Sequence, residues 1–166
     1  MAKQKKPVRP SDGHSVIATN RTARRDYDIL DTYEAGMVLR GTEVKSLREA
    51  QVQFADANVW IDGGEAWVMG IHIQPWGTSR SYHDQPLEPA RRRKLLLHAH
   101  EIDELQRRSQ VDRLALVPIA LYFKGGRVKV EVAVGRGRRK ADKRQVLAAR
   151  DAEREMDRAT KAARQR

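Results

Sequence analysis

Two basic segments have the composition of phosphate-binding sites. Residues 91–94 are three arginines and a lysine, and residues 135–140 combine two glycines with three arginines and a lysine. Guanidinium forks bind phosphate oxygens in pairs, and glycine lets the backbone approach an anion. We expect residues 91–94 to contact phosphate, because cations at the start of the helix predicted there would oppose its dipole. Residues 135–140 have two open interpretations, a phosphate cradle or a solvated basic linker.

The remaining chemically capable residues form no recognised catalytic or metal-binding pattern. His98 and His100 are two positions apart on a predicted helix, so they point in different directions and cannot easily hold one ion. The chain has no cysteine, which excludes disulfides, thiol catalysis and cysteine-ligated metals. It also lacks a nucleophile elbow. We therefore expect no enzyme, no metal and no cofactor.

The net charge of +11 is concentrated at the two ends of the 166-residue chain. Residues 1–12 carry a net +3, residues 13–134 a net +1 and residues 135–166 a net +7. A nearly neutral body with cationic arms is typical of proteins that bind nucleic acid or an anionic membrane. No apolar run is long enough for a membrane span, and we expect no secretory signal, because no apolar segment follows the charged N-terminal residues. The composition predicts a cytoplasmic protein.

Short strands and tight turns dominate the predicted body. Residues 58–69 flank Gly63-Gly64 and residues 114–134 flank Lys124-Gly125-Gly126-Arg127, two patterns that indicate hairpins. Further strands are expected at 26–30, at 71–73 and at 33–39, the last of which either extends the first or forms a separate strand. About six antiparallel strands without βαβ spacing predict a closed or partly closed barrel.

Two helices are expected beside these strands. Residues 41–48 form the first, with Thr42 as a possible N-cap. Residues 91–108 form the second, because Leu95, Ala99, Ile102 and Leu105 share one helical face. Leu96 and the leucine after it cannot both lie on that face, so at least one is partly exposed or packs elsewhere.

The chain divides into three parts. Residues 1–13 form a disordered basic arm, residues 14–134 the barrel, and residues 135–166 a basic tail. The tail has high helix propensity but only a thin apolar stripe, so we expect it to be disordered until bound. Trp60, Trp67 and Tyr122 are expected in the core, whereas Tyr33 and Trp76 are left open. The few aromatics favour recognition of structured RNA by shape rather than by base stacking.

Five segments together resemble one family, small protein B, the SsrA-binding proteins of bacterial trans-translation. They are residues 20–23 (NRTA), 33–39 (YEAGMVL), 41–48 (GTEVKSLR), 93–98 (RKLLLH) and 142–144 (DKR). The resemblance spans residues 16–144. It implies an OB-like barrel with flanking helices and a tail that becomes helical in the ribosome.

The resemblance also implies roles for particular residues. Those linked to binding RNA are Asn20, Tyr27, Glu34, Leu96 and Lys129. Those in the ribosome-binding tail are Arg136, Gly137, Arg138, Arg139, Asp142, Lys143 and Arg144. Ala141 stands where the family usually has a ring side chain.

By this resemblance the protein is an adaptor that binds the tRNA-like part of transfer-messenger RNA and brings it to stalled ribosomes. The implied partners are that RNA, the decoding region and messenger channel of the small subunit, and elongation factor Tu through the aminoacylated RNA. A monomer without membrane contact is expected. Three alternatives remain: a general structured-RNA-binding or ribosome-associated OB-type protein, an enzyme that uses body carboxylates on nucleotides, and a membrane-surface protein. The tail lacks the large apolar face that the last requires.

Overall fold

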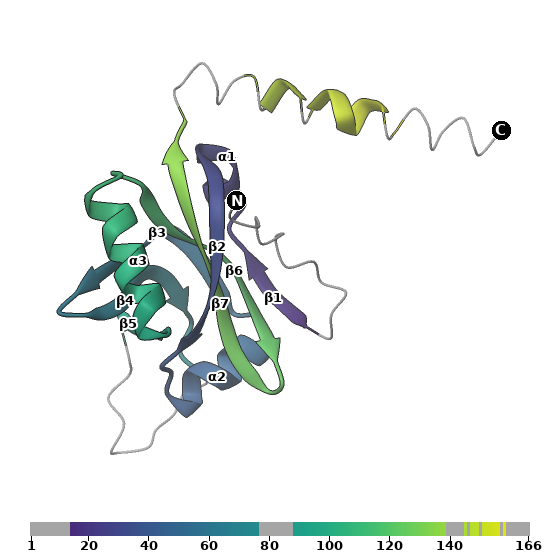
Figure 1. The fold of residues 1–166 in the computed structure, drawn as a ribbon. Coiled ribbons are helices and arrows are strands. Elements are labelled where there is room, and N and C mark those ends of the chain that lie inside the picture. The colour runs from purple at the N-terminus through teal and green to yellow at the C-terminus, as the bar shows by residue number, and fades with distance from the viewer. Residues whose placement is uncertain are drawn as a thin grey trace.

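The computed structural model describes residues 14–76, 88–138, 145, 147–149, 151–156 and 158. In the described body, strands predominate and short helices flank them (Figure 1). The elements in chain order are β1 Ser15–Thr19, α1 Arg21–Asp26, β2 Tyr27–Met37, α2 Gly41–Arg48, β3 Val52–Asp62, β4 Glu65–Ile73, β5 Arg93–Leu96, α3 Ala99–Gln110, β6 Ala115–Lys124 and β7 Arg127–Gly137.

The strands of the described body form one antiparallel sheet in the order β1-β6-β7-β2-β5-β4-β3. This confirms a mainly β fold with flanking helices, with seven strands in place of about six. The sheet is not closed, because β1 and β3 are its two edges. It nevertheless curls, since β3 packs against β6. The expected barrel is therefore a curved, open sheet.

The main hydrophobic core fills the inner face of this curved sheet. Val128, Val130, Val132 and Val134 alternate along β7 and all lie in this core, as their period of two predicts. Leu105 of α3 packs into the same core. A smaller cluster on the opposite face of β6 and β7 lies beneath α1. The outer face of the sheet is thus covered at one end and open elsewhere.

The aromatic side chains differ partly from expectation. Tyr122 is buried as predicted, but Trp60 and Trp67 are only half-buried. The sequence does not decide the burial of Tyr33 and Trp76. In the structure Tyr33 is buried in the main core, and Trp76 is exposed. The Arg92 guanidinium lies over the Trp67 ring, 5.1 Å from its centroid.

Both predicted hairpins are present. Gly63 and Gly64 have φ values of 57° and 75°, and Gly125 and Gly126 have values of 55° and 74°. Glycine adopts these left-handed conformations without steric cost, which allows a two-residue turn. Residues 27–37 form one continuous strand, β2. The segment expected at 33–39 therefore extends the preceding strand and does not form a separate one.

The predicted helix at 91–108 is wrong in its first half. Residues 93–96 form β5, and α3 begins only after His98, its N-cap. Arg93 and Leu95 are buried whereas Lys94 is half-buried and Leu96 is exposed, which is the period of a strand. Leu95 fits the predicted helical stripe with Ala99 because residues four apart lie on the same side of a helix and also of a strand. The expected exposure of a leucine is nevertheless confirmed at Leu96.

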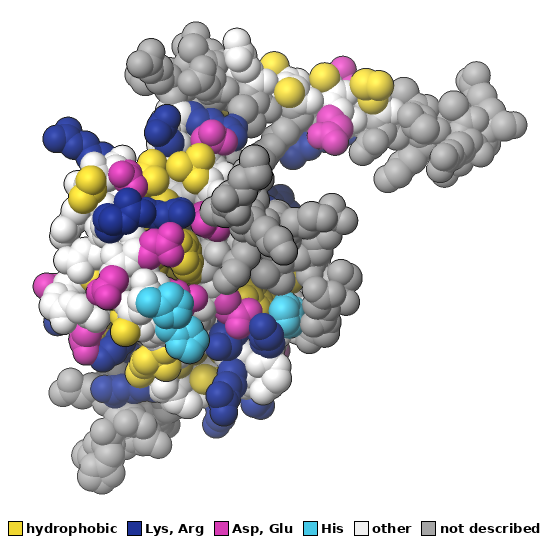
Figure 2. All heavy atoms as spheres, viewed as in Figure 1, with side chains coloured by type: hydrophobic (Ala, Val, Ile, Leu, Met, Phe, Trp, Pro, Cys, Tyr) yellow, Lys and Arg dark blue, Asp and Glu magenta, His cyan; other side chains and the backbone are white. Residues whose placement is uncertain are grey.

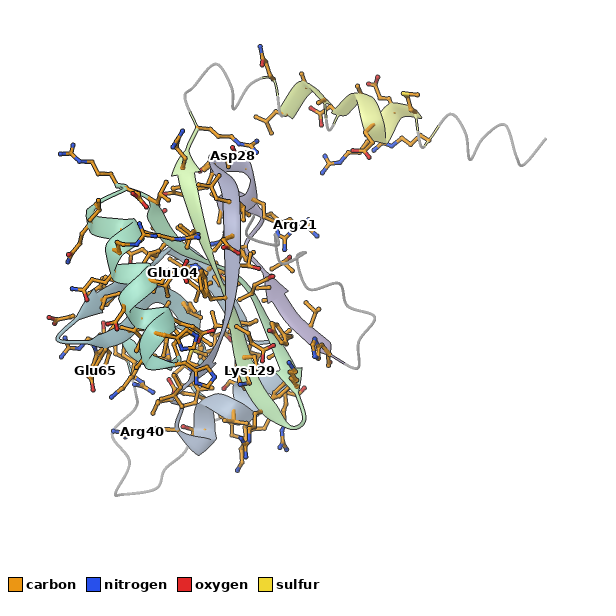
Figure 3. All side chains as sticks on the ribbon, viewed as in Figure 1. Arg21, Asp28, Arg40, Glu65, Glu104 and Lys129 are labelled. Atoms are coloured by element: carbon orange, nitrogen blue, oxygen red, sulfur yellow. The ribbon has the colours of Figure 1, made fainter. Side chains whose placement is uncertain are left out.

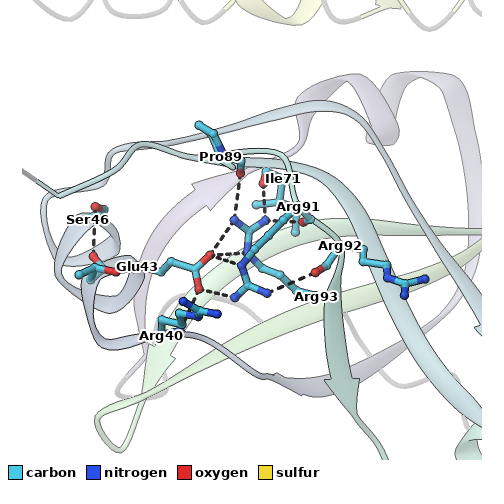
Figure 4. Close-up of polar contacts among 9 residues, drawn as sticks. Arg40, Glu43, Ser46, Ile71, Pro89, Arg91, Arg92 and Arg93 are labelled. Carbon is cyan, nitrogen blue, oxygen red and sulfur yellow. Dashed lines mark hydrogen bonds and ion pairs between the residues drawn. The ribbon is translucent and has the colours of Figure 1, made fainter. Parts of the chain in front are cut away.

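The expected phosphate contact of residues 91–94 is wrong for the buried Arg93, and Arg91 pairs with the same carboxylate, Glu43 (Figure 4). Arg91 Nη2 lies 2.5 Å from Glu43 Oε2, and Arg93 Nη2 lies 2.8 Å from Glu43 Oε1. Arg93 is fully buried and also donates to the Ile71 carbonyl at 2.7 Å. These cations therefore join α2 to β4 and β5. Residues 91–94 do not oppose a helix dipole, because they precede α3 and are not in its first turn.

The start of α2 also differs from expectation. Its N-cap is Arg40 and not Thr42, and the Arg40 amide donates to Glu43 Oε2 at 2.8 Å. The same carboxylate thus caps the helix and neutralises two arginines. Residues 41–48 otherwise form the predicted helix.

The predicted boundary between body and tail falls inside a strand. β7 continues to Gly137, three residues beyond the expected end of the body. Residues 145, 147–149, 151–156 and 158 are helical, and their described side chains are exposed. The arm at 1–13 lies outside the described residues. Disorder of the free tail stays a prediction.

Candidate nucleic-acid interface

Three of the residues predicted to bind RNA lie together on the open outer face of the sheet. Leu96 of β5 pairs with Gly36 of β2, and Gly36 pairs in turn with Lys129 of β7. Glu34 lies two residues from Gly36 on the same face. Side chains in register across adjacent strands are neighbours, so Leu96, Lys129 and Glu34 form one continuous surface.

Gly36 shapes this surface by having no side chain. A Cβ atom there would lie 3.3 Å from the Cβ of Leu96, closer than ordinary van der Waals contact. Leu96 therefore lies over the backbone of β2 while 54% of its surface stays exposed. Leu96 is thus an exposed apolar side chain on the same face as Lys129 and Glu34.

Glu34 is the centre of a polar group that we call the Glu34 cluster: Glu34, Tyr122, Lys124 and Lys129. The Tyr122 hydroxyl donates to Glu34 Oε2 at 2.8 Å. Lys124 Nζ lies 2.9 Å from Oε2 and 3.0 Å from Oε1, and Lys129 Nζ lies 3.8 Å from Oε1. The cluster ties β2 to β6 and β7 on the same face as Leu96.

The protonation states of the cluster follow from these contacts. Burial alone would raise the pKa of Glu34, but the hydrogen bonds from Lys124 and Tyr122 outweigh it and lower the pKa below its ordinary value. Burial and the Glu34 carboxylate raise the pKa of the Tyr122 phenol. Glu34 is therefore charged at neutral pH and Tyr122 remains a protonated donor.

Asn20 and Tyr27 lie at the other end of the sheet, so the five predicted residues do not form one cluster. Figure 3 shows the same separation, with Lys129 near the turn between β6 and β7 and Arg21 and Asp28 near the opposite end. Asn20 and Tyr27 line a pocket of about 350 Å³ between α1 and the segment 54–58 of β3.

Asn20 is buried, and its amide is used within the protein. Its Oδ1 accepts from the Ala23 amide at 3.0 Å, which caps α1. Its Nδ2 donates to the Pro118 carbonyl at 3.0 Å. Both ends of the amide are thus engaged, and Asn20 fixes α1 to β6. The half-buried Tyr27 ring, by contrast, borders the pocket.

The strand that leads into the tail ends beside Tyr27. Gly137 pairs with Tyr27 in the sheet, and the exposed Arg136 precedes it. The Arg138 amide donates to the Asp26 carbonyl at 2.8 Å, and its guanidinium lies 3.6 Å from the Asp28 carboxylate. The tail therefore leaves the body from the Asn20 and Tyr27 end. The predicted tail residues Arg139, Asp142, Lys143 and Arg144 lie outside the described residues.

Sequence reasoning missed several residues of this face. Tyr122 was expected only as core, and neither Lys124 nor Arg24 was singled out. Arg24 Nη2 lies 3.7 Å from the buried Glu131, which pairs with Glu34 in the sheet register. The alternation of Tyr122 and Lys124 in β6 was a usable signal, because it places both on one face.

The charged side chains on the visible surface are mixed. Figure 2 shows basic, acidic and hydrophobic side chains side by side rather than one continuous basic patch. The exposed His98 and His100 rings stack 5.6 Å apart. Among the described residues, no group of three histidine, aspartate or glutamate side chains could hold a metal ion. No helix in the described part of the chain is long and apolar enough to cross a membrane.

These features define a small, basic, mainly β protein whose open sheet face carries lysine, glutamate and leucine side chains together. A family model described as SmpB protein matches residues 17–162. The SsrA-binding protein of Mycolicibacterium vanbaalenii is 51% identical over 160 residues, covering 95% of this chain and 93% of that protein. The SsrA-binding protein of Oleidesulfovibrio alaskensis is 51% identical over 146 residues, covering 87% and 92%. The chain therefore belongs to the SmpB family.

A solved structure agrees with this assignment. It is described as "tmRNA-SmpB: a journey to the center of the bacterial ribosome". One of its chains is 40% identical to this chain with a TM-score of 0.62, and the match covers 78% of this chain and 93% of that chain.

Proposed function

We propose that this protein binds the tRNA-like domain of transfer-messenger RNA and delivers it to stalled ribosomes for trans-translation. Membership of a family whose relatives are SsrA-binding proteins carries this proposal. The outer face supports it, because Leu96, Lys129 and Glu34 lie together on rigid strands. Such a surface recognises a structured RNA by shape and backbone rather than by sequence.

The protein acts as a cytoplasmic, monomeric adaptor and not as an enzyme. Elongation factor Tu reaches it through the aminoacylated RNA. The basic tail, residues 135–166, enters the small subunit near the decoding region and follows the empty messenger channel. Its cationic side chains provide the salt-dependent attraction to ribosomal RNA.

The five predicted RNA-binding residues act in two different ways. Leu96, Lys129, Glu34 and Tyr27 contact RNA directly, since each is at least partly exposed. Asn20 acts through its hydrogen bonds, because it is buried and its amide is bonded to the Ala23 amide and the Pro118 carbonyl. It holds α1 and the neighbouring Tyr27 in the position that the RNA requires.

A binding titration tests this function. The full-length protein is titrated at two salt concentrations with the tRNA-like domain and with an unrelated hairpin of the same size. We expect tighter binding to the tRNA-like domain that persists at the higher salt. Equal affinity for both RNAs would leave only the alternative of a general structured-RNA-binding protein.

A pair of adjacent leucines provides the matched variants. Leu96→Asp is expected to weaken binding at least tenfold with little change in melting temperature, because Leu96 is exposed. Leu95 is 1% exposed, so Leu95→Asp places a charge in the core and is expected to unfold the body. Loss of folding in Leu96→Asp would contradict the assignment of Leu96 to the interface.

A further inference from the structure

The Glu34 carboxylate is held firmly from one side and open on another. Tyr122 and Lys124 occupy positions on its oxygens at 2.8 to 3.0 Å, and Lys129 lies farther away at 3.8 Å. A carboxylate offers about four lone-pair positions. The Glu34 side chain keeps 30% of its surface exposed. At least one acceptor position therefore faces outward, beside Leu96 and Lys129.

We infer that Tyr122 is a positioning residue that holds Glu34 as a hydrogen-bond acceptor for an N–H or O–H donor of RNA. This inference rests on the proposed function. It assigns a task to a tyrosine that the sequence placed only in the core. It also gives the acidic residue of the interface a defined chemical role.

A carboxylate on a nucleic-acid-binding face needs such an arrangement. Phosphates repel it, so the part of RNA that it can bind is a donor on a base edge or on the ribose. The N1–H and amino groups of an unpaired guanine are two adjacent donors, and each ribose has a 2′-hydroxyl. Lys124 and Lys129 offset the negative charge against the surrounding phosphates.

Tyr122 is suited to fixing the direction of the carboxylate. It is 2% exposed, and His14 stacks on its ring at 5.1 Å, so the phenol cannot swing away. It remains protonated because burial and Glu34 raise its pKa. The hydroxyl therefore always donates, and Glu34 always receives this bond on Oε2. A flexible lysine alone would leave the carboxylate free to change rotamer.

The test removes only the hydroxyl. Tyr122→Phe is expected to weaken binding to the tRNA-like domain about fivefold to tenfold. The slope of log K against log salt should not change, because no phosphate contact is lost. Glu34→Gln is expected to weaken binding about tenfold or more, and adding Tyr122→Phe to it should change affinity less than twofold. A merely structural tyrosine would lower affinity equally in both backgrounds.

Two further variants keep the result interpretable. Tyr33→Phe removes a hydroxyl from a buried tyrosine on the inner face and is expected to bind RNA as the unmodified protein does. Lys124→Gln alters a 46% exposed side chain, so it does not threaten folding. It should weaken binding with Glu34 present and much less in Glu34→Gln. If Tyr122→Phe binds normally, or if Lys124→Gln and Glu34→Gln act independently, the inference is wrong.

Modified RNAs distinguish the two donor sources. One tRNA-like domain carries inosine at its unpaired guanines, and a second carries 2′-deoxynucleotides in its loops. One of them should lose affinity for the unmodified protein but not for Glu34→Gln. Equal losses with both proteins would overturn the inference. Failure of the unmodified protein to prefer the tRNA-like domain would instead overturn the proposed function.

Discussion

Glu34 and Glu43 show how one residue type serves two purposes in a basic protein. Both carboxylates have lowered pKa values, and both are surrounded by cations. Glu43 is buried and joined to Arg91 and Arg93, so it holds the fold together. Glu34 is partly exposed beside Leu96, so it can reach a partner. The two carboxylates therefore differ in burial, and only Glu34 is accessible to the RNA in the proposed function.

The Glu43 network leads to a prediction on stability. Glu43→Gln removes the charge that compensates the fully buried Arg93, and we expect it to lower the free energy of unfolding by about 3 kcal/mol at pH 7. Chemical denaturation measures this value. Glu65→Gln is the control, because Glu65 forms an exposed ion pair with Lys94 that contributes less than about 1 kcal/mol. Equal effects of the two variants would contradict the structural role of Glu43.

The same network sets a dependence on pH. Burial would raise the pKa of Glu43, but the hydrogen bond from Arg91, the Arg40 amide and the charge of Arg93 lower it below 4.5. The unfolded chain therefore binds more protons in acid, and the stabilisation is complete above about pH 4.5 and lost as the pH falls through the lowered pKa. As the pH falls below about 4.5, the free energy of unfolding should fall less steeply in Glu43→Gln than in the unmodified protein.

Among the elements, β3 carries a bulge where it pairs with β4. Phe54 pairs with Ile71 and Asn58 with Met69, so the three residues between on β3 face the single Gly70 on β4. Asp56 has a φ of 49° within this bulge, and Gly70 has a φ of 80°. The bulge bends β3 toward α1, where Asp56 and its neighbours line the pocket of Asn20 and Tyr27.

Gly70 is therefore a position where only glycine fits. A Cβ atom there would lie 2.5 Å from the Ala55 carbonyl oxygen and 2.6 Å from the Ala57 Cα, in addition to the cost of its positive φ. We expect Gly70→Ala to lower the free energy of unfolding by more than about 2 kcal/mol. Gly63→Ala is the matched control, since its φ is also positive but no atom lies within 4 Å, and it should cost about 1 kcal/mol. Equal losses in thermal or denaturant unfolding would contradict the close contact.

At the scale of the whole molecule, charge and fold are divided between parts of the chain. The described body carries the Glu34 cluster and Leu96, whereas residues 135–166 carry a net charge of +7. Under the proposed function, the sheet is the rigid surface for the tRNA-like domain, and the tail provides cations for ribosomal RNA. This division predicts that the two functions can be separated by truncation.

Deletion of residues 140–166 tests the division. We expect the truncated protein to keep its melting temperature and to bind the tRNA-like domain within a few-fold of the full chain. Tagging of stalled nascent chains in a reconstituted translation system should be lost. A chain with the same tail residues in scrambled order separates sequence from charge. If the truncation abolishes binding to the tRNA-like domain, the tail is part of that interface and the proposed division is wrong.

The sequence by itself determined the hairpins, the valine-lined core and the family, because these depend on local patterns: Gly-Gly pairs, a period of two, and contiguous motifs. It did not determine β5, α1 or the burial of Arg93. β5 has four residues and α1 has six, so each is too short for its apolar pattern to distinguish a helix from a strand. Both form through contacts with distant parts of the chain. Only the tertiary structure showed that Arg91 and Arg93 pair with Glu43 and that the Asn20 amide bonds to α1 and β6. It also brought Tyr122 to Glu34, 88 residues away in the chain. Partners across a sheet are fixed by strand order and register, which the local sequence does not contain.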